Sequence, residues 1–209
     1  MEAIRRDDEH HIEKHQSITA MIQNRPIETV FFGDSLIRRW EEHPELWERF
    51  FSTFQPANLG VGGDRLEHMK WRLLNGQIAG LSPRVFLFLG GTNNLPDQKS
   101  ETIASHIIEL LEIVQTHLPE AEILLLGLLP RSGGVAGRPY AEKIQNINAT
   151  LQRWAQERGV HFCDLGPYLS ADGEHLISEI TDDGLHLNAL GYERIGSPLA
   201  KEITELFGR

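Results

Sequence analysis

The sequence of 209 residues has a single cysteine and no long apolar run. Cys163 cannot form an internal disulfide, which agrees with a reducing compartment. No stretch approaches the ~20 apolar residues that a membrane-spanning helix needs. The charged segment from Met1 to Gln16 also lacks the apolar centre of a signal peptide. We therefore expect a cytoplasmic protein with no stable membrane insertion.

Basic residues are outnumbered as well. Thirty Asp and Glu residues against twenty Lys and Arg residues give a formal net charge of -10. Such a charge repels a phosphate backbone, so nucleic acid is not an expected partner. The composition, 40% hydrophobic and 24% charged, is that of an ordinary globular protein. We expect residues 1–209 to form a single domain, with residues 1–27 as an N-terminal helical extension packed on it.

Apolar segments of strand length recur along the chain, each followed by turn residues. They are Thr29–Phe32, Arg84–Leu89, Ile123–Leu129 and Val160–Leu165, with a weaker candidate at Phe54–Val61. Between them the apolar residues follow a helical period, as in residues 103–114. This alternation predicts an α/β fold with helices on both faces of a parallel sheet. In such sheets ligands bind outside the carboxyl ends of the strands.

A serine hydroxyl stands at a turn directly after the first predicted strand, in Gly33-Asp34-Ser35-Leu36. The same residues also suit a helix N-cap, a role that serine and aspartate favour in any protein. A carboxylate and an imidazole stand three residues apart at Asp183 and His186. In a turn, Asp183 can fix the tautomer of His186 and leave its other ring nitrogen to take a proton from a serine. An acidic loop that caps a helix is the alternative.

Two further segments supply candidate hydrogen-bond donors after strands. Glycines at positions 60, 62 and 63 follow the second strand, and Asn93 and Asn94 follow the third. Glycine lets a backbone amide face a ligand, and a carboxamide is a neutral donor for a developing oxyanion. Each segment alone also fits an ordinary turn. Their combination with a serine, a histidine and an aspartate favours a catalytic site.

These segments, in this order, resemble the four conserved blocks of the SGNH (GDSL) hydrolase superfamily over residues 28–195. The blocks are Gly33-Asp34-Ser35-Leu36, the glycine before Asp64, Gly91-Thr92-Asn93 and Asp183-Gly184-Leu185-His186. The stretches 58–64, 71–76, 91–94 and 126–131 more closely resemble the platelet-activating-factor acetylhydrolase catalytic-subunit branch. The resemblance implies a flavodoxin-like three-layer α/β/α sandwich with a five-stranded parallel sheet.

The resemblance also implies the role of each site residue. Ser35 is the expected nucleophile, supported by Asp183 and His186, and the Ser35 amide, Gly63 and Asn93 are the expected oxyanion donors. Asp34, Leu36 and Asn94 are expected beside the substrate, although Asn94 replaces an aspartate that supports the loop in the family. The expected substrate is a small ester with a short acyl group, and the reaction needs no metal and no organic cofactor. A homodimer is a possible assembly, because the subunits resembled here form dimers.

Other functions fit parts of the sequence. A flavodoxin-like binding domain would use the glycine loops for a phosphate or flavin, but neither a Walker lysine nor a Gly-x-Gly-x-x-Gly run follows the first strand. A scaffold protein could reuse the hydrolase fold for docking. The spacing of His11 and His15 also fits a metal clamp on one helical face, with a solvated helix as the alternative.

Overall fold

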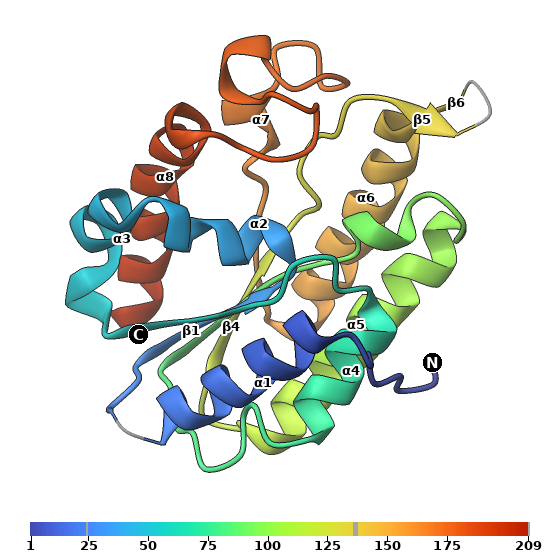
Figure 1. Cartoon of the computed structure of the whole chain (residues 1–209). Helices are drawn as coiled ribbons and strands as arrows, with labels where there is room; N and C mark the ends of the chain where they lie inside the picture. Colours follow the sequence, from blue (N-terminus) through green and yellow to red (C-terminus); the bar gives the residue numbers. More distant parts are fainter. Residues whose placement is uncertain (24, 136–137, 209) are drawn as a thin grey trace.

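The computed structural model describes residues 1–23, 25–135 and 138–208 and places a parallel sheet at its centre (Figure 1). Its strands are β1 (Thr29–Gly33), β2 (Pro56–Gly60), β3 (Val85–Leu89), β4 (Glu122–Leu126) and β7 (His161–Cys163). The order across this five-stranded sheet is β2-β1-β3-β4-β7, and every pair is parallel. This is the flavodoxin-like order, so the predicted fold class is confirmed.

Helices cover both faces of the sheet. One face carries α1 (Glu9–Ile22), α4 (Leu66–Leu74), α5 (Ser100–His117) and α6 (Tyr140–Arg158). The other carries α2 (Ser35–Arg38), α3 (Pro44–Phe51), α7 (Gly166–Leu169) and α8 (Ala189–Phe207). Short 3-10 helices are η1 (Arg39–Glu42), η2 (Ser52–Phe54), η3 (Thr92–Asn94) and η4 (Ser178–Ile180). A small antiparallel pair joins β5 (Gly134–Val135) with β6 (Arg138–Pro139), in the connection between β4 and α6.

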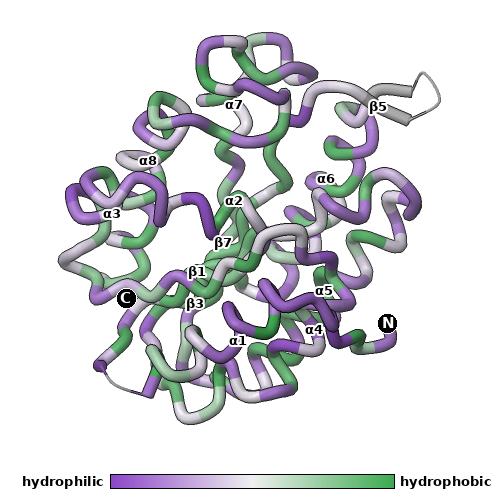
Figure 2. The backbone as a smooth tube through the Cα atoms, viewed as in Figure 1, coloured by the Kyte–Doolittle hydropathy of each residue, from purple (hydrophilic) through white to green (hydrophobic). Residues whose placement is uncertain are grey.

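The two faces follow from the period of two along each strand. Val30 and Phe32 point into the cluster under α1, α4, α5 and α6, whereas Phe31 points into the cluster under α2, α3, α7 and α8. All three side chains are fully buried, as expected for a strand covered on both sides. Figure 2 shows the most hydrophobic part of the chain gathered in this central sheet.

Two predicted strands are shorter than their apolar runs. The run at 123–129 is a strand only as far as Leu126, because the Asn148 side chain takes over the next pairing position. Its Oδ1 accepts a hydrogen bond from the N–H of Leu128 at 2.8 Å, and its Nδ2 donates to the carbonyl of Leu128 at 3.0 Å. The edge strand β2 begins only at Pro56, since Gln55 before it has a positive φ of 44°.

Within the part of the chain that the structure describes, no helix combines the length and the apolar character needed to cross a bilayer. The N-terminal helix α1 lies against the sheet, with Ile18 and Ile22 in the same apolar cluster as Val30 and Phe32. The N-terminal segment is therefore continuous with the core that carries the site.

Candidate active site

Ser35 lies where the chain leaves the sheet, as the first residue of α2 directly after β1. Asp34 caps this short helix by accepting a hydrogen bond from the N–H of Leu36 at 2.9 Å. Gly60 lets α2 lie directly on β2, because a Cβ atom at Gly60 would come within 2.2 Å of the backbone nitrogen of Arg38. Ser35 is consequently held on a rigid turn.

A serine, a histidine and an aspartate form one hydrogen-bonded chain. Ser35 Oγ lies 2.9 Å from His186 Nε2, and His186 Nδ1 lies 2.6 Å from Asp183 Oδ2. The other oxygen, Asp183 Oδ1, accepts hydrogen bonds from the backbone N–H groups of His186 at 2.7 Å and Leu185 at 2.9 Å. This arrangement leaves Nε2 facing the serine, as a general base requires.

Asp183 is held in its ionised form. Partial burial acts to raise the pKa of Asp183, but hydrogen bonds from the His186 ring and from the backbone N–H groups of His186 and Leu185 outweigh it. The result is a pKa well below the ordinary range for aspartate. The carboxylate is therefore available to orient the imidazole and to stabilise an imidazolium.

The chain contains a second aspartate–histidine turn with the same local geometry. Asp172 Oδ2 lies 3.0 Å from His175 Nδ1, and Asp172 Oδ1 accepts the backbone N–H of His175 at 2.8 Å. His175 is exposed, with 61% of its side-chain surface open, whereas His186 retains 20% and contacts Ser35. Only the tertiary fold distinguishes the two turns.

Two of the three expected oxyanion donors, Gly63 and Asn93, follow the two strands that flank β1. Gly33 pairs with Gly60 on one side and with Leu89 on the other, so the segments that follow converge at the same sheet edge. Gly63 follows β2 in a turn with φ of 74°. The Nδ2 of Asn93 donates to the carbonyl of Asp64 at 2.8 Å, which leaves one amide hydrogen for another acceptor.

The nearby glycines differ in the availability of their N–H groups. The N–H of Gly60 is engaged, since it donates to Asn58 Oδ1 at 2.9 Å. Among the described residues, the N–H groups of Gly62 and Gly63 have no acceptor. The structure thus reduces the three candidate glycines to two.

Asn94, Asp34 and Leu36 have buried side chains, which favours a supporting role for them over substrate contact. Asn94 Oδ1 accepts the N–H of Leu66 at the start of α4 at 3.0 Å, and its Nδ2 donates to Glu67 at 2.9 Å. Asn94 therefore joins the loop after β3 to α4.

Asp34 carries an unusual carboxyl group beside the serine. Complete burial raises the pKa of Asp34 to about 7, against the opposing effect of the Leu36 hydrogen bond and with a further contribution from the negative charge of Asp64. Among the described residues, its Oδ2 has no hydrogen-bond partner. The folded protein therefore holds a proton on Asp34 at pH values where the unfolded chain has lost it.

This shift predicts a stability difference that depends on pH. With a folded pKa of about 7 and an ordinary unfolded value, the contribution of Asp34 is full below ~pH 4 and is lost as pH rises to about 7. The loss is on the order of 4 kcal/mol. Urea unfolding of Asp34→Asn should therefore show its stability relative to the wild type rising from about pH 5 to about pH 8. Asp7→Asn, at an exposed aspartate, is the control; equal slopes for both variants would contradict the assignment.

A buried ion pair under the site was not predicted from the sequence. Asp64 and Arg72 are both fully buried, and Arg72 Nε donates to Asp64 Oδ2 at 2.6 Å. Arg72 also donates to the carbonyls of Leu59 at 2.8 Å and Gly33 at 2.9 Å. It thereby joins the ends of β1 and β2. One sequence signal could have indicated it: Arg72 comes three residues after Met69, on the buried, otherwise apolar face of α4.

His11 and His15 lie against other parts of the protein. His11 is buried, with Nδ1 at 3.3 Å from Asp64 Oδ1, and His15 Nδ1 lies 2.9 Å from Gln77 Nε2. Their rings are stacked with centroids 6.5 Å apart. His11 is buried and His15 is half-buried, so the pair lies against the network under the site and not on a fully solvated helix face.

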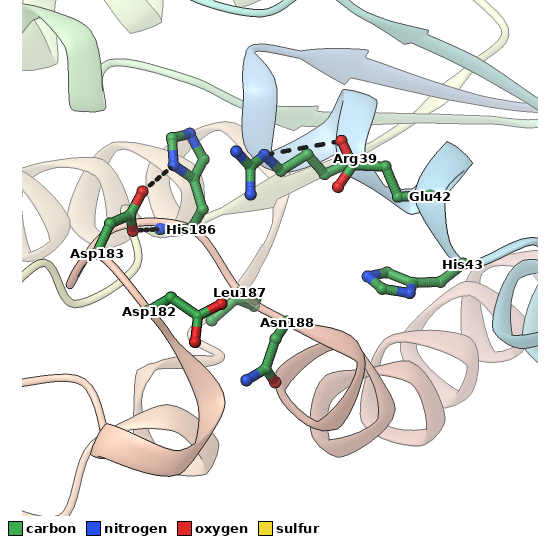
Figure 3. A pocket seen from close by; sticks show the side chains of 8 residues that line it. All are labelled: Arg39, Glu42, His43, Asp182, Asp183, His186, Leu187 and Asn188. Carbon is green, nitrogen blue, oxygen red and sulfur yellow. Dashed lines mark hydrogen bonds and ion pairs between the residues drawn. The ribbon is translucent and has the colours of Figure 1, made fainter.

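A pocket of about 180 Å³ adjoins the triad on the side of Asp183 and His186 (Figure 3). It is lined by Arg39, Glu42, His43, Asp182, Asp183, His186, Leu187 and Asn188, of which Leu187 alone has an apolar side chain. The Nε of Arg39 is buried without a hydrogen-bond partner among the described residues, and Glu42 lies 3.9 Å from it. A charged donor thus stands beside the candidate base.

A hydrogen-bonded serine, histidine and aspartate at the carboxyl end of a parallel sheet is the arrangement of a serine hydrolase, here on a flavodoxin-like α/β fold. The chain belongs to the GDSL-like lipase/acylhydrolase family, whose model matches residues 31–194. This membership identifies it as a carboxylic ester hydrolase and confirms the resemblance inferred from the four blocks.

Curated relatives support the same family. The human platelet-activating factor acetylhydrolase IB subunit alpha2 is 30% identical over 95% of this chain and 86% of its own length. The human subunit alpha1 is 33% identical over 85% of this chain and 76% of its own length.

Solved structures share the fold. A GDSL-like lipase from Bacteroides thetaiotaomicron superposes with a TM-score of 0.76 at 20% identity, over 92% of this chain and 97% of that one. Est24, a carbohydrate acetylesterase from Sinorhizobium meliloti, gives 0.70 at 19% identity, over 87% and 100%.

Proposed function

We propose that the protein hydrolyses short-chain acyl esters through an acyl-enzyme on Ser35. His186 Nε2 takes the Ser35 proton as Oγ attacks the ester carbonyl, and the Ser35 amide, Gly63 and Asn93 stabilise the oxyanion. The C–O bond to the alcohol then breaks, and the alcohol leaves with the proton from His186. Water repeats the sequence and releases the acid. The observation that carries this proposal is the 2.9 Å contact between Ser35 Oγ and His186 Nε2.

We infer that the alcohol part of the substrate is polar and lies over the pocket beside His186. The leaving alcohol must be near His186 Nε2 to receive its proton. The neighbouring lining offers charged groups at Arg39, Glu42 and Asp182. These groups suit hydroxyl or anionic groups on the alcohol, as in an acetylated sugar or the glycerol part of a small lipid.

Covalent labelling and a substrate panel test the proposal together. A fluorophosphonate should label Ser35, as seen by peptide mass spectrometry, and Ser35→Ala should give no adduct at that position. The kcat/KM for p-nitrophenyl esters should fall as the acyl chain lengthens from acetate. The kcat/KM values for acetylated sugars and for lysophospholipids then show which class of alcohol the pocket prefers. Ester turnover without an adduct on Ser35 would rule out the mechanism. A preference for palmitate would rule out the short acyl group.

We also propose a cytoplasmic location and a homodimer. The single cysteine supports the location. The dimer rests on the resemblance to dimeric acetylhydrolase subunits. Fractionation and sedimentation equilibrium measure these two properties separately.

A further inference from the structure

The N-terminal segment before α1 covers the turn that contains Gly63. The N–H of Ile4 donates to the carbonyl of Glu67 in α4 at 3.0 Å, which anchors this segment alongside α4 (Figure 1). The Arg6 guanidinium then lies over Gly63, since a Cβ atom at Gly63 would be 3.6 Å from Arg6 Nη1. A residue far from the triad in sequence therefore contacts a candidate oxyanion turn.

Arg6 binds the peptide group to which the Gly63 N–H belongs. Arg6 Nη1 donates to the carbonyl of Gly62 at 2.7 Å. The carbonyl of Gly62 and the N–H of Gly63 are parts of one planar trans peptide, so they point in opposite directions. Fixing the carbonyl toward Arg6 consequently directs the N–H away from the N-terminal segment. A cation on the carbonyl also polarises the peptide and strengthens the N–H as a donor.

Arg6 is itself held in place by two carboxylates. Its Nη1 also donates to Asp64 Oδ1 at 3.0 Å, and its Nε donates to Asp8 Oδ2 at 2.8 Å. Asp64 is fully buried and fixed from the opposite side by Arg72. The guanidinium therefore joins the N-cap of α1 to the buried ion pair under the site.

The same ion pair reaches the other parts of the oxyanion site. Arg72 binds the carbonyl of Gly33, two residues before Ser35. The carbonyl of Asp64 accepts the side chain of Asn93. The serine turn, the Gly63 turn and Asn93 thus share one rigid support, and Arg6 is its contact on the N-terminal side.

We propose that Arg6 is a positioning residue for the oxyanion hole: it fixes the Gly62–Gly63 peptide so that the Gly63 N–H faces the reacting carbonyl. This inference rests on the proposed function. With 20% of its side-chain surface exposed, Arg6 pairs with the buried Asp64 and binds the Gly62 carbonyl, so its loss affects both stability and the orientation of the turn. A small misplacement of a transition-state donor raises the barrier without weakening ground-state binding.

The test is the steady-state kinetics of Arg6→Ala with p-nitrophenyl acetate. We expect kcat to fall by roughly 10- to 100-fold with KM nearly unchanged. Arg6→Lys should lose less, because an ammonium keeps the charge but not the fixed fork of donors. Added ethylguanidinium should restore part of kcat in Arg6→Ala and none in the wild type.

Arg5→Ala is the matched control. Arg5 is the neighbouring arginine, and its guanidinium lies over the Trp71 ring at 5.5 Å instead of at the turn. We expect it to keep the wild-type kcat. A folded Arg6→Ala protein with a lowered Tm and an unchanged kcat would overturn the proposal, as would equal losses in both variants. If Arg6→Ala does not fold, a wild-type kcat in Arg6→Lys would overturn it. A wild type without esterase activity would contradict the proposed function instead.

Discussion

Replacing His186 with alanine should abolish turnover of p-nitrophenyl acetate, with a fall in kcat of about 10⁶-fold. His186 Nε2 is the group that contacts Ser35 Oγ, so its loss removes both the base for attack and the acid for the leaving alcohol. The second turn supplies a matched control, because His175 pairs with Asp172 in the same local geometry but is exposed. His175→Ala should retain the wild-type kcat.

The aspartates of the two turns extend this test. Asp183→Asn should lower kcat by about 10⁴-fold while the protein keeps its fold, because an amide holds the ring in the wrong tautomer. Asp172→Asn should leave kcat unchanged. Circular dichroism and Tm report whether each variant is folded. Full activity in His186→Ala, or equal losses at positions 175 and 186, would show that the assigned triad is wrong.

Two of the proposed site residues, Ser35 and Asn93, were predictable because they follow strands. Buried parallel strands have a recognisable apolar sequence, and in this fold their carboxyl ends lie at one edge. Ser35 and Asn93 each come within a few residues of a strand end, and the structure places both there. Glycine at position 60 was visible as a turn signal, but its close approach to Arg38 was not.

Contacts between distant residues were not predictable in the same way. The strand end at Leu126 depends on the side chain of Asn148, which is far along the chain in α6. Asp172 and Asp183 stand in similar local sequences, and only the fold brings one of the two turns to Ser35. A charge on the apolar face of a helix needs a buried partner. The sequence does not show that this partner is Asp64, because the pairing forms only when α4 lies against the end of β2.

Asn93 and Asn94 are adjacent residues of one type, and we expect opposite effects when each is replaced by alanine. Asn93→Ala should lower kcat by roughly 10²–10³-fold with little change in KM, because a donor to the oxyanion acts mainly in the transition state. Asn94→Ala should instead lower the free energy of unfolding by about 1–3 kcal/mol, because its buried amide binds the N–H of Leu66 and the carboxylate of Glu67. Kinetics well below the Tm of each variant, together with urea unfolding, separate the two effects.

The hydrogen bonds explain why the neighbours should differ. Asn93 is half-buried and uses one amide hydrogen on the carbonyl of Asp64, so the other can serve the oxyanion. Asn94 is fully buried, with both ends of its amide engaged by α4. If Asn94→Ala were the kcat variant and Asn93→Ala had no effect, the third sequence block would be assigned one residue out of register. Equal and modest losses in both would reduce this segment to an asparagine-rich turn, and the oxyanion would then depend on the backbone donors of Ser35 and Gly63 alone.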